Sequence, residues 1–370
     1  MKTRYQIIDT TLREGEQAPG VFFTAEQKRL IIGGLVGTGI SEVELGIAAP
    51  LAPCQASLVR FCREHYPSLQ LSLWSRCLAE DIEQAAVAAV DTVSLSIPVS
   101  DLLLATKLGR NRGWAEQTAC DAIHRVRELG LSAAIGFEDA TRADRAFLLE
   151  LSSRVEEAGA WRIRLADTVG IVSPLAMAGL VGELKRVLHG AQIAVHTHND
   201  FGMATANAVA ALDAGATWVD ATVLGLGERC GCARLEEVVG YLTLVRDVSE
   251  LSISCLVELA NEVAAMTRRP VSPWAPVTGS SIFTCESGLH LQGLLIDPRT
   301  YEPYPPELVG SCRTLQVGAK SGRAAMRQML ASDGRDNLTI SVEQARRIRD
   351  RACELGRGMN WEELDELLKW

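Results

Sequence analysis

Short strand-like segments alternate with helix-like segments through the first two thirds of the chain, and this alternation limits the fold more than any other feature. Eight such pairs fit into about 240 residues, which is the rhythm of a TIM (β/α)₈ barrel. The pairs of strand and helix are residues 5–8 and 25–35, 42–45 and 52–65, 70–74 and 79–89, 92–97 and 114–129, 131–136 and 142–157, 162–166 and 174–188, 193–196 and 204–214, and 218–223 and 235–245.

We therefore predict an α/β fold, a TIM barrel followed by a linker and a small helical subdomain. An open, doubly wound sheet is less favoured, because no G-x-G-x-x-G motif follows the first strand-like segment. With one or two further helices, the catalytic domain spans residues 1–269. Residues 270–322 are rich in proline, glycine, serine and tyrosine, which disfavours regular helix or sheet; embedded apolar residues indicate an ordered rather than a disordered linker. Residues 323–370 predict short amphipathic helices.

Composition and charge disfavour several classes of protein. A net charge of −9 opposes binding to nucleic acid or to an anionic membrane, since phosphate groups would be repelled. The sequence shows neither an apolar run of ~18 residues nor a signal-peptide pattern, so we expect a cytoplasmic enzyme. The ten cysteines are expected to be reduced, and the Cys230-x-Cys232 spacing is more consistent with an incidental pair than with a zinc or redox site.

The most reactive side chains follow the strand-like segments, where TIM barrels carry their catalytic groups. His196 and His198, two of only six histidines, share one face of the seventh strand because side chains alternate along a strand. Alone, such a pair is more often structural, and an isolated Arg13–Glu14 pair is more often a surface ion pair worth ~0–1 kcal/mol. The other polar groups at strand ends are Asp9, Glu44, Arg76, Glu138, Asp139, Asp167, Thr168 and the loop 225–229.

Together these residues have the composition of a metal site that binds an oxo acid. Two imidazoles and one carboxylate leave coordination positions open on a divalent cation. The carboxylate and keto oxygens of a 2-oxo acid fit those positions, and Arg13 beside them can stabilise a developing alkoxide. The residues alone leave open which carboxylate completes the site.

Several longer motifs carry a resemblance to a known family. They are residues 8–17 (IDTTLREGEQ), 196–204 (HTHNDFGMA) and 225–229 (GLGER), with shorter matches at 166–170 (ADTVG) and 287–290 (SGLH). With them the chain resembles, over essentially its whole length, the Claisen-condensing acyltransferases, which include homocitrate, 2-isopropylmalate and citramalate synthases. The resemblance implies acetyl-CoA and a 2-oxo acid as substrates and a divalent cation, Mg²⁺, Mn²⁺ or Zn²⁺, as cofactor.

The same resemblance implies roles for individual residues near the cation. Asp9, His196 and His198 would be its ligands, and Glu14 would be a supporting acid or an alternative ligand. Arg13 would polarise the keto group of the substrate.

Other implied roles concern the two substrates. His290, with Tyr301 nearby, would help to enolise the methyl group of acetyl-CoA, since a thioester methyl must lose a proton before it attacks. Thr168 and Glu138 resemble positions that contact the oxo acid or support catalysis, and Glu44 is similar to a supporting acid. In relatives the segment with His290 crosses to the partner barrel, so a homodimer with exchanged C-terminal segments is implied. A distal substrate carboxylate would need a cation, and Arg76 or Lys107 is our hypothesis for it, independent of the resemblance.

The chain departs from the family pattern at three positions. Cys232, Cys285 and Ala319 stand where relatives often have asparagine, histidine and histidine. The first puts a metal contact in doubt, and the others affect CoA contacts or rate.

Features outside the motifs point to one branch of the family. The roughly 50 residues after Gly322 are too few for the leucine-regulatory domain of many 2-isopropylmalate synthases, which needs on the order of 100. Residues 134–138 lack the pattern of lysine-pathway homocitrate synthases. Residues 96–101 and 107–110 are most similar to the nitrogen-fixation type of homocitrate synthase. That type uses 2-oxoglutarate to make the organic acid of the iron–molybdenum cofactor. Alternatives are citramalate or 2-isopropylmalate synthase, a lyase on the same barrel, and a catalytically silent barrel that serves as a binding subunit.

Overall fold

A computed structural model describes residues 5–51, 55–286, 288–323, 326–327, 330, 334 and 339–368 of the chain. The chain forms two compact units, Met1–Pro270 and Val271–Trp370. Within the described ranges, the search for a helix long and apolar enough to cross a membrane finds none.

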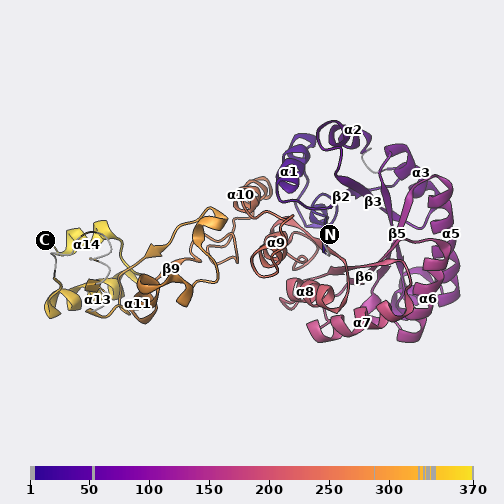
Figure 1. The fold of residues 1–370 in the computed structure, drawn as a ribbon. Helices are drawn as coiled ribbons and strands as arrows, with labels where there is room; N and C mark the ends of the chain where they lie inside the picture. Colours follow the sequence, from indigo (N-terminus) through magenta and orange to yellow (C-terminus); the bar gives the residue numbers. More distant parts are fainter. Residues whose placement is uncertain are drawn as a thin grey trace. The chain divides into compact units, whose positions relative to one another are not determined.

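The first unit is a closed barrel of parallel strands in the order β1 to β8, which confirms the predicted TIM barrel (Figure 1). The barrel closes where β1 pairs with β8, with Asp9 opposite Ala221. The strands are β1 Gln6–Asp9, β2 Glu42–Ile47, β3 Gln70–Arg76, β4 Thr92–Pro98, β5 Ser132–Glu138, β6 Arg162–Asp167, β7 Gln192–Thr197 and β8 Trp218–Ala221.

Helices surround the strands, and local sequence explains several of their starts (Figure 1). Thr24 and Gln27 form a capping box at the first helix, and Ser173 caps the helix that begins with Pro174. The predicted helix at 52–65 is described from Ala56 onward, and residues 52–54 lie outside the described ranges. The helices are α1 Ala25–Gly37, α2 Ala56–His65, α3 Ala79–Ala88, α4 Asp101–Leu103, α5 Arg112–Glu128, α6 Arg145–Ala158, α7 Pro174–Val187, α8 Ala204–Ala214, α9 Leu235–Leu244 and α10 Leu256–Thr267.

Two differences from the predicted boundaries affect the catalytic end of the barrel. Strand β8 ends at Ala221, because a 3₁₀ turn at Val223–Gly225 follows in which Leu224 has a φ of 60°. Between β4 and α5 the chain forms α4 and a π-helical turn at Leu104–Leu108, neither of which was predicted. Such turns depend on tertiary packing more than on the apolar period of the segment.

The second unit has a hydrophobic core of its own. Helix α11 (Gly288–Ile296), α13 (Val342–Leu355) and α14 (Trp361–Leu368) accompany a two-stranded parallel sheet of β9 (Thr284–Cys285) and β10 (Thr314–Leu315). The buried core residues are Leu291, Val317, Met326, Leu330, Ile340, Ile348, Ala352, Met359, Leu364 and Leu368.

The expectation that residues 270–322 disfavour regular structure is wrong for α11. The prolines of this segment leave a proline-free interval from 277 to 297, and the apolar residues within it form the helix.

Candidate metal and substrate site

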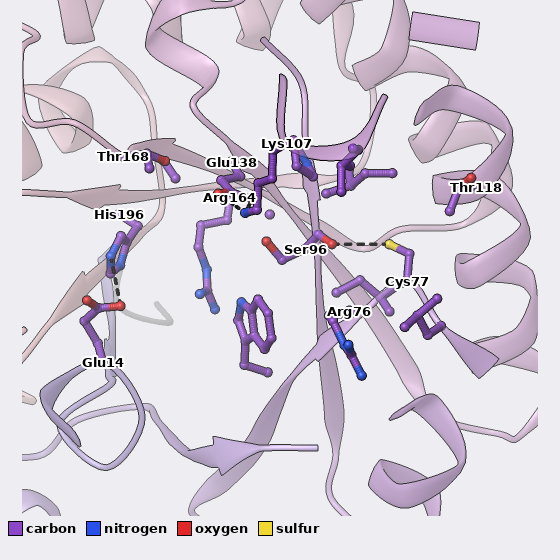
Figure 2. A pocket seen from close by; sticks show the side chains of 18 of the residues that line it. Glu14, Arg76, Cys77, Ser96, Lys107, Thr118, Glu138, Arg164, Thr168 and His196 are labelled. Atoms are coloured by element: carbon purple, nitrogen blue, oxygen red, sulfur yellow. Dashed lines mark hydrogen bonds and ion pairs between the residues drawn. The ribbon is translucent and has the colours of Figure 1, made fainter. Parts of the chain in front are cut away.

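Glu14, His196 and His198 form a buried cluster at the carboxyl end of the barrel. One ligand atom from each lies within 4.8 Å of the others. Nε2 of His196 is 3.6 Å from Oε2 of Glu14 (Figure 2). Nε2 of His198 is 3.5 Å from Oε1 of the same carboxylate. Glu14 follows β1, His196 is the next-to-last residue of β7, and His198 directly follows that strand, so only β8 separates the contributing strands.

The partners of the two Nδ1 atoms define how the rings face Glu14. Nδ1 of His196 lies 2.8 Å from Oδ2 of Asp220, and Nδ1 of His198 lies 3.1 Å from the carbonyl oxygen of Asp167. Because an ionised carboxylate and a carbonyl only accept hydrogen bonds, both Nδ1 atoms carry a proton, and Nε2 of each ring is the nitrogen that faces Glu14 and could bind a cation. Nε2 of His198 is buried and has no hydrogen-bond partner among the described residues.

These donors fit a divalent cation. Burial opposes ionisation of Glu14, but Arg13 and then the two histidines outweigh it, so the pKa of Glu14 lies well below its usual range. The cluster therefore consists of one carboxylate and two imidazoles. Each imidazole is oriented by a partner on its Nδ1 atom, as metal-binding histidines commonly are.

Asp9 lies outside this cluster of three. Its two carboxylate oxygens accept hydrogen bonds from the backbone N–H and the hydroxyl of Thr11, each at 2.9 Å. Complete burial raises the pKa of Asp9 to about 7, although both hydrogen bonds oppose the shift. The structure thus groups Glu14, the alternative ligand, with the histidines, and a ligand role for Asp9 stays a prediction.

Arg13 is held by two carboxylates. Its Nε donates to Glu44 at 2.6 Å and its Nη1 donates to Glu14, which leaves Nη2 without a partner among the described residues. Glu44 is fully buried and also accepts from Nη2 of Arg164 at 2.9 Å. Burial opposes ionisation of Glu44, but Arg13 and Arg164 keep its pKa well below the usual range. Glu44 does not line the cavity described below, so its substrate contact stays a prediction.

Arg164 is a part of the site that the sequence prediction missed. It lines the cavity from the middle of β6, and its Nη1 is 3.2 Å from Asp220, the residue that orients His196. A usable signal was present: Arg162 and Arg164 alternate with apolar residues in a buried strand, so both face the barrel interior.

A cavity of about 620 Å³ extends from the cluster across the barrel. Figure 2 shows Glu14 and His196 at one side of it and Arg76, Cys77 and Thr118 at the other.

Three further predicted site residues line this cavity. Glu138 accepts hydrogen bonds from Nζ of Lys107 at 2.8 and 3.2 Å. Thr168 accepts from the backbone N–H of Asp139 at 2.8 Å, so its own hydroxyl hydrogen remains available to a ligand. Arg76 donates two hydrogen bonds to buried Asp81, at 2.7 and 2.9 Å, which restrains its guanidinium.

His290 and Tyr301 belong to the second unit. Their rings pack edge to face with centroids 4.4 Å apart, and both residues are exposed. Ser287 of the matching motif lies outside the described residues.

The loop after β8 is bound to the loops that follow β6 and β7. Arg229 donates to both oxygens of Asp200 at 2.9 Å and to the carbonyl of Thr168 at 2.8 Å. Cys232, at the position where relatives often have asparagine, is buried with its Sγ 3.1 Å from the Thr222 hydroxyl, and it is not part of the three-residue cluster.

Comparison with known proteins shows the family of the chain. The family model described as HMGL-like matches residues 4–263, and the one described as Homocitrate synthase post-HMGL domain-like matches residues 277–364. A homocitrate synthase from Frankia alni is 43% identical over 89% of this chain and 93% of its own, and homocitrate synthase 1 from Nostoc is 40% identical over 98% and 96%.

More distant relatives share the length or the fold. A 2-phosphonomethylmalate synthase from Streptomyces rubellomurinus is 35% identical over 99% of this chain and 98% of its own. Among solved structures, an HMG-CoA lyase from Bacillus subtilis superposes with a TM-score of 0.64 at 18% identity, over 72% of this chain and 95% of its own, which shows a shared barrel fold. The chain therefore belongs to the HMGL-like family, within the group of enzymes formed by the homocitrate and 2-isopropylmalate synthases.

Proposed function

We propose that the protein is a homocitrate synthase, which condenses acetyl-CoA with 2-oxoglutarate and hydrolyses the thioester to release homocitrate and CoA. The observation that carries the proposal is the cluster of Glu14, His196 and His198 beside Arg13, in a chain about 40% identical to homocitrate synthases over most of its length. We extend the proposal to synthesis of the organic acid of the iron–molybdenum cofactor of nitrogen fixation, on the resemblance of residues 96–101 and 107–110 to that type.

The barrel residues would bind and polarise the oxo acid. Glu14, His196 and His198 would hold a divalent cation, which supplies Lewis acidity at the keto group when bound. Nη2 of Arg13 is free to donate to the keto oxygen as it gains negative charge, and the hydrogen bonds to Glu14 and Glu44 preorganise the guanidinium for this task.

Other cavity residues would orient the same substrate. The Thr168 hydroxyl can donate to the carboxylate next to the keto group. The Glu138–Lys107 pair would contribute polar contacts in the cavity, and Arg76, restrained by Asp81, offers its remaining N–H groups to an anionic end of the acid. Asp9 would support the cluster, and Glu44 would hold Arg13 in position.

We assign removal of the methyl proton of acetyl-CoA to His290, assisted by Tyr301. The resulting carbanion equivalent forms the new bond to the keto carbon, the keto oxygen takes up a proton, and water then cleaves the thioester to release CoA.

We also propose that the protein is a homodimer with exchanged C-terminal segments. On the barrel, large apolar side chains are exposed on segments that follow strands at the catalytic end. These residues, the apolar rim, are Phe22, Leu51, Leu78, Leu102, Leu108, Ile171 and Phe201. We infer that a second subunit covers part of this rim, since a contiguous apolar patch, unlike a single exposed residue, is typical of an interaction surface.

The substrate is tested by measuring release of the CoA thiol from acetyl-CoA with 2-oxoglutarate, pyruvate and 2-oxoisovalerate in parallel, with Mg²⁺ or Mn²⁺. We expect the highest kcat/KM with 2-oxoglutarate. A preference for pyruvate or 2-oxoisovalerate would instead indicate a citramalate or 2-isopropylmalate synthase, and no release with any acid would indicate a silent barrel.

The exchanged dimer is tested by mixing two inactive variants, His196→Ala and His290→Ala, under conditions that let subunits exchange. Random exchange makes half of the dimers mixed. If each site combines one barrel with the partner's His290, every mixed dimer has one intact site of its two, so about a quarter of the wild-type activity should return. If both residues act within one chain, every site stays defective and no activity returns.

A further inference from the structure

The cavity is lined by several cations, and nearly all of them are already paired with carboxylates. Arg13 pairs with Glu14 and Glu44, Arg164 with Glu44 and Asp220, Arg76 with Asp81, and Lys107 with Glu138. Arg110 is different, because it lines the cavity and has no carboxylate partner anywhere in the described part of the chain.

The backbone around Arg110 is shaped by the π-helical turn after β4. The turn Leu104–Leu108 ends at Gly109, whose φ of 63° reverses the chain, and the N–H of Arg110 donates to the carbonyl of Leu104 at 2.8 Å. This arrangement puts Lys107, Leu108 and Arg110 on the cavity wall together. Single π-helical turns are rare and occur frequently at functional sites.

Two neighbours make the position of Arg110 suited to an anion. Its guanidinium lies over the ring of Trp114, 5.6 Å from the centroid, and Trp114 also lines the cavity. Asn111 next to it caps α5, so the N–H groups of the first turn add positive potential at the same place. A stacked guanidinium is restrained in orientation while its N–H edge stays free for a bidentate oxyanion.

Arg112, two residues away, provides the contrast. It donates to both oxygens of Asp101, at 2.7 and 2.5 Å, lies 3.4 Å from Asp144, and does not line the cavity. The unpaired charge of this loop is therefore that of Arg110.

The barrel order separates Arg110 from the metal cluster. Arg110 follows β4, whereas the cluster comes from β1 and β7, and β4 is three strands from either. Thr118, one turn along α5 from Trp114, lies on the side of the cavity opposite Glu14 and His196 (Figure 2). A substrate anchored at the cluster would reach Arg110 only with its far end.

We propose that Arg110 binds an oxyanion at the end of a substrate remote from the reacting carbon. The inference rests on the proposed function, whose substrates carry two such groups, the distal carboxylate of 2-oxoglutarate and the phosphates of CoA. A guanidinium binds both by the same bidentate hydrogen bonds.

Calorimetric titration tests the proposal without requiring turnover. Wild type and Arg110→Gln are titrated with two pairs of ligands in the presence of Mn²⁺. The first pair is 2-oxoglutarate and 2-oxopentanoate, which lacks the distal carboxylate. The second pair is CoA and pantetheine, which lacks the phosphates. We expect Kd to rise about tenfold for 2-oxoglutarate or for CoA, and to stay unchanged for the counterpart that lacks the remote anionic group. A selective effect on 2-oxoglutarate identifies the carboxylate as the anion, and one on CoA identifies a phosphate.

Arg112→Gln is the matched control and should leave all Kd values unchanged, while Arg110→Lys should recover part of the lost affinity. Equal Kd values for wild type and Arg110→Gln, or a rise of the same size for ligands with and without the remote anionic group, would overturn the proposal. Because binding is measured, absence of turnover with 2-oxoglutarate counts against the proposed function and leaves this test intact.

Discussion

Asp220 connects His196 of the candidate metal site to the charged interior of the barrel. Its Oδ2 lies 2.8 Å from Nδ1 of His196 and 3.2 Å from Nη1 of Arg164, and it is fully shielded from solvent in β8. Arg164 in turn bonds to Glu44, which holds Arg13. The orientation of the His196 imidazole and of the Arg13 guanidinium therefore depends on one network of buried charges, in which each ion has a partner.

Asp220→Asn should lower the affinity for a divalent cation by about 10- to 100-fold, because the amide no longer supports the tautomer of His196 that presents Nε2 to the cluster. Metal titration and kcat at saturating cation measure the two effects. Asp213→Asn, at an exposed acid paired with Arg246, is the control. An unchanged metal affinity in Asp220→Asn would contradict the orienting role.

Glu236 gives a prediction for pH dependence. Complete burial raises its pKa from 4.5 to about 7, although the N–H of Leu224 donates to it at 2.8 Å and opposes the shift. Between these values the unfolded chain has lost the proton while the folded chain keeps it. The contribution of Glu236 to stability therefore falls as pH rises through this interval and is gone above about pH 7. Glutamine does not titrate, so Glu236→Gln should gain stability relative to wild type over this interval, on the order of 3 kcal/mol.

Urea denaturation of both proteins with chelator, between pH 4.5 and 8, measures this difference. A difference in the free energy of unfolding that stays constant with pH would show that Glu236 does not titrate in this range in the folded protein.

At the scale of elements, the loop after β8 determines how the end of β7 is held. The carbonyl of Gly231 accepts from the N–H of Asn199 at 2.9 Å, and Cys232 forms an antiparallel bridge with His198. Gly231 has a φ of 82°, and a Cβ built on it would collide with the carbonyl oxygen of Gly225. The loop thus requires glycine at this position for two independent reasons.

Gly231→Ala should therefore lower kcat/KM and the free energy of unfolding, the latter by at least ~1–2 kcal/mol. Gly182→Ala is the matched control, because a Cβ there, within α7, meets no atom within 4 Å. It should raise stability by about 0.5–1 kcal/mol and leave activity unchanged. Thermal denaturation and steady-state kinetics distinguish the two outcomes, and wild-type activity in Gly231→Ala would show that the loop tolerates rearrangement.

At the scale of the whole molecule, the chain consists of two units with separate cores, and the second contains His290 and Tyr301. A core of its own allows the second unit to lose structure without unfolding of the barrel.

Ile348→Ala tests this independence, because Ile348 is fully buried in the core of the second unit. We expect the free energy of unfolding of that unit alone to fall by about 2–5 kcal/mol. Proteolysis within residues 271–370 should then be faster than in wild type, while the main calorimetric transition of the barrel stays at the same temperature. Ile296→Ala, at a residue that is 73% exposed in the same unit, is the control and should change little. A parallel shift of both transitions would show that the units unfold together.

Much of the architecture could be predicted because it depends on local patterns. The β-then-α period predicted the barrel, and strand alternation predicted that His196 and His198 share a face. The π-helical turn at Leu104–Leu108 has no such periodic signal, and the helix at Gly288–Ile296 was obscured by the prolines on both sides of it.

The sequence by itself thus determined the fold, the family and the chemical types of the site residues, since these depend on periodicity and on motifs of adjacent residues. Only the tertiary structure decided that Glu14, rather than Asp9, lies with His196 and His198, and that Asp220 and Arg164 connect His196 to Glu44. The physical reason is that these contacts cross the barrel. Which charges meet there depends on how the closed sheet brings strand ends together and on which carboxylates are already bound by their own neighbours.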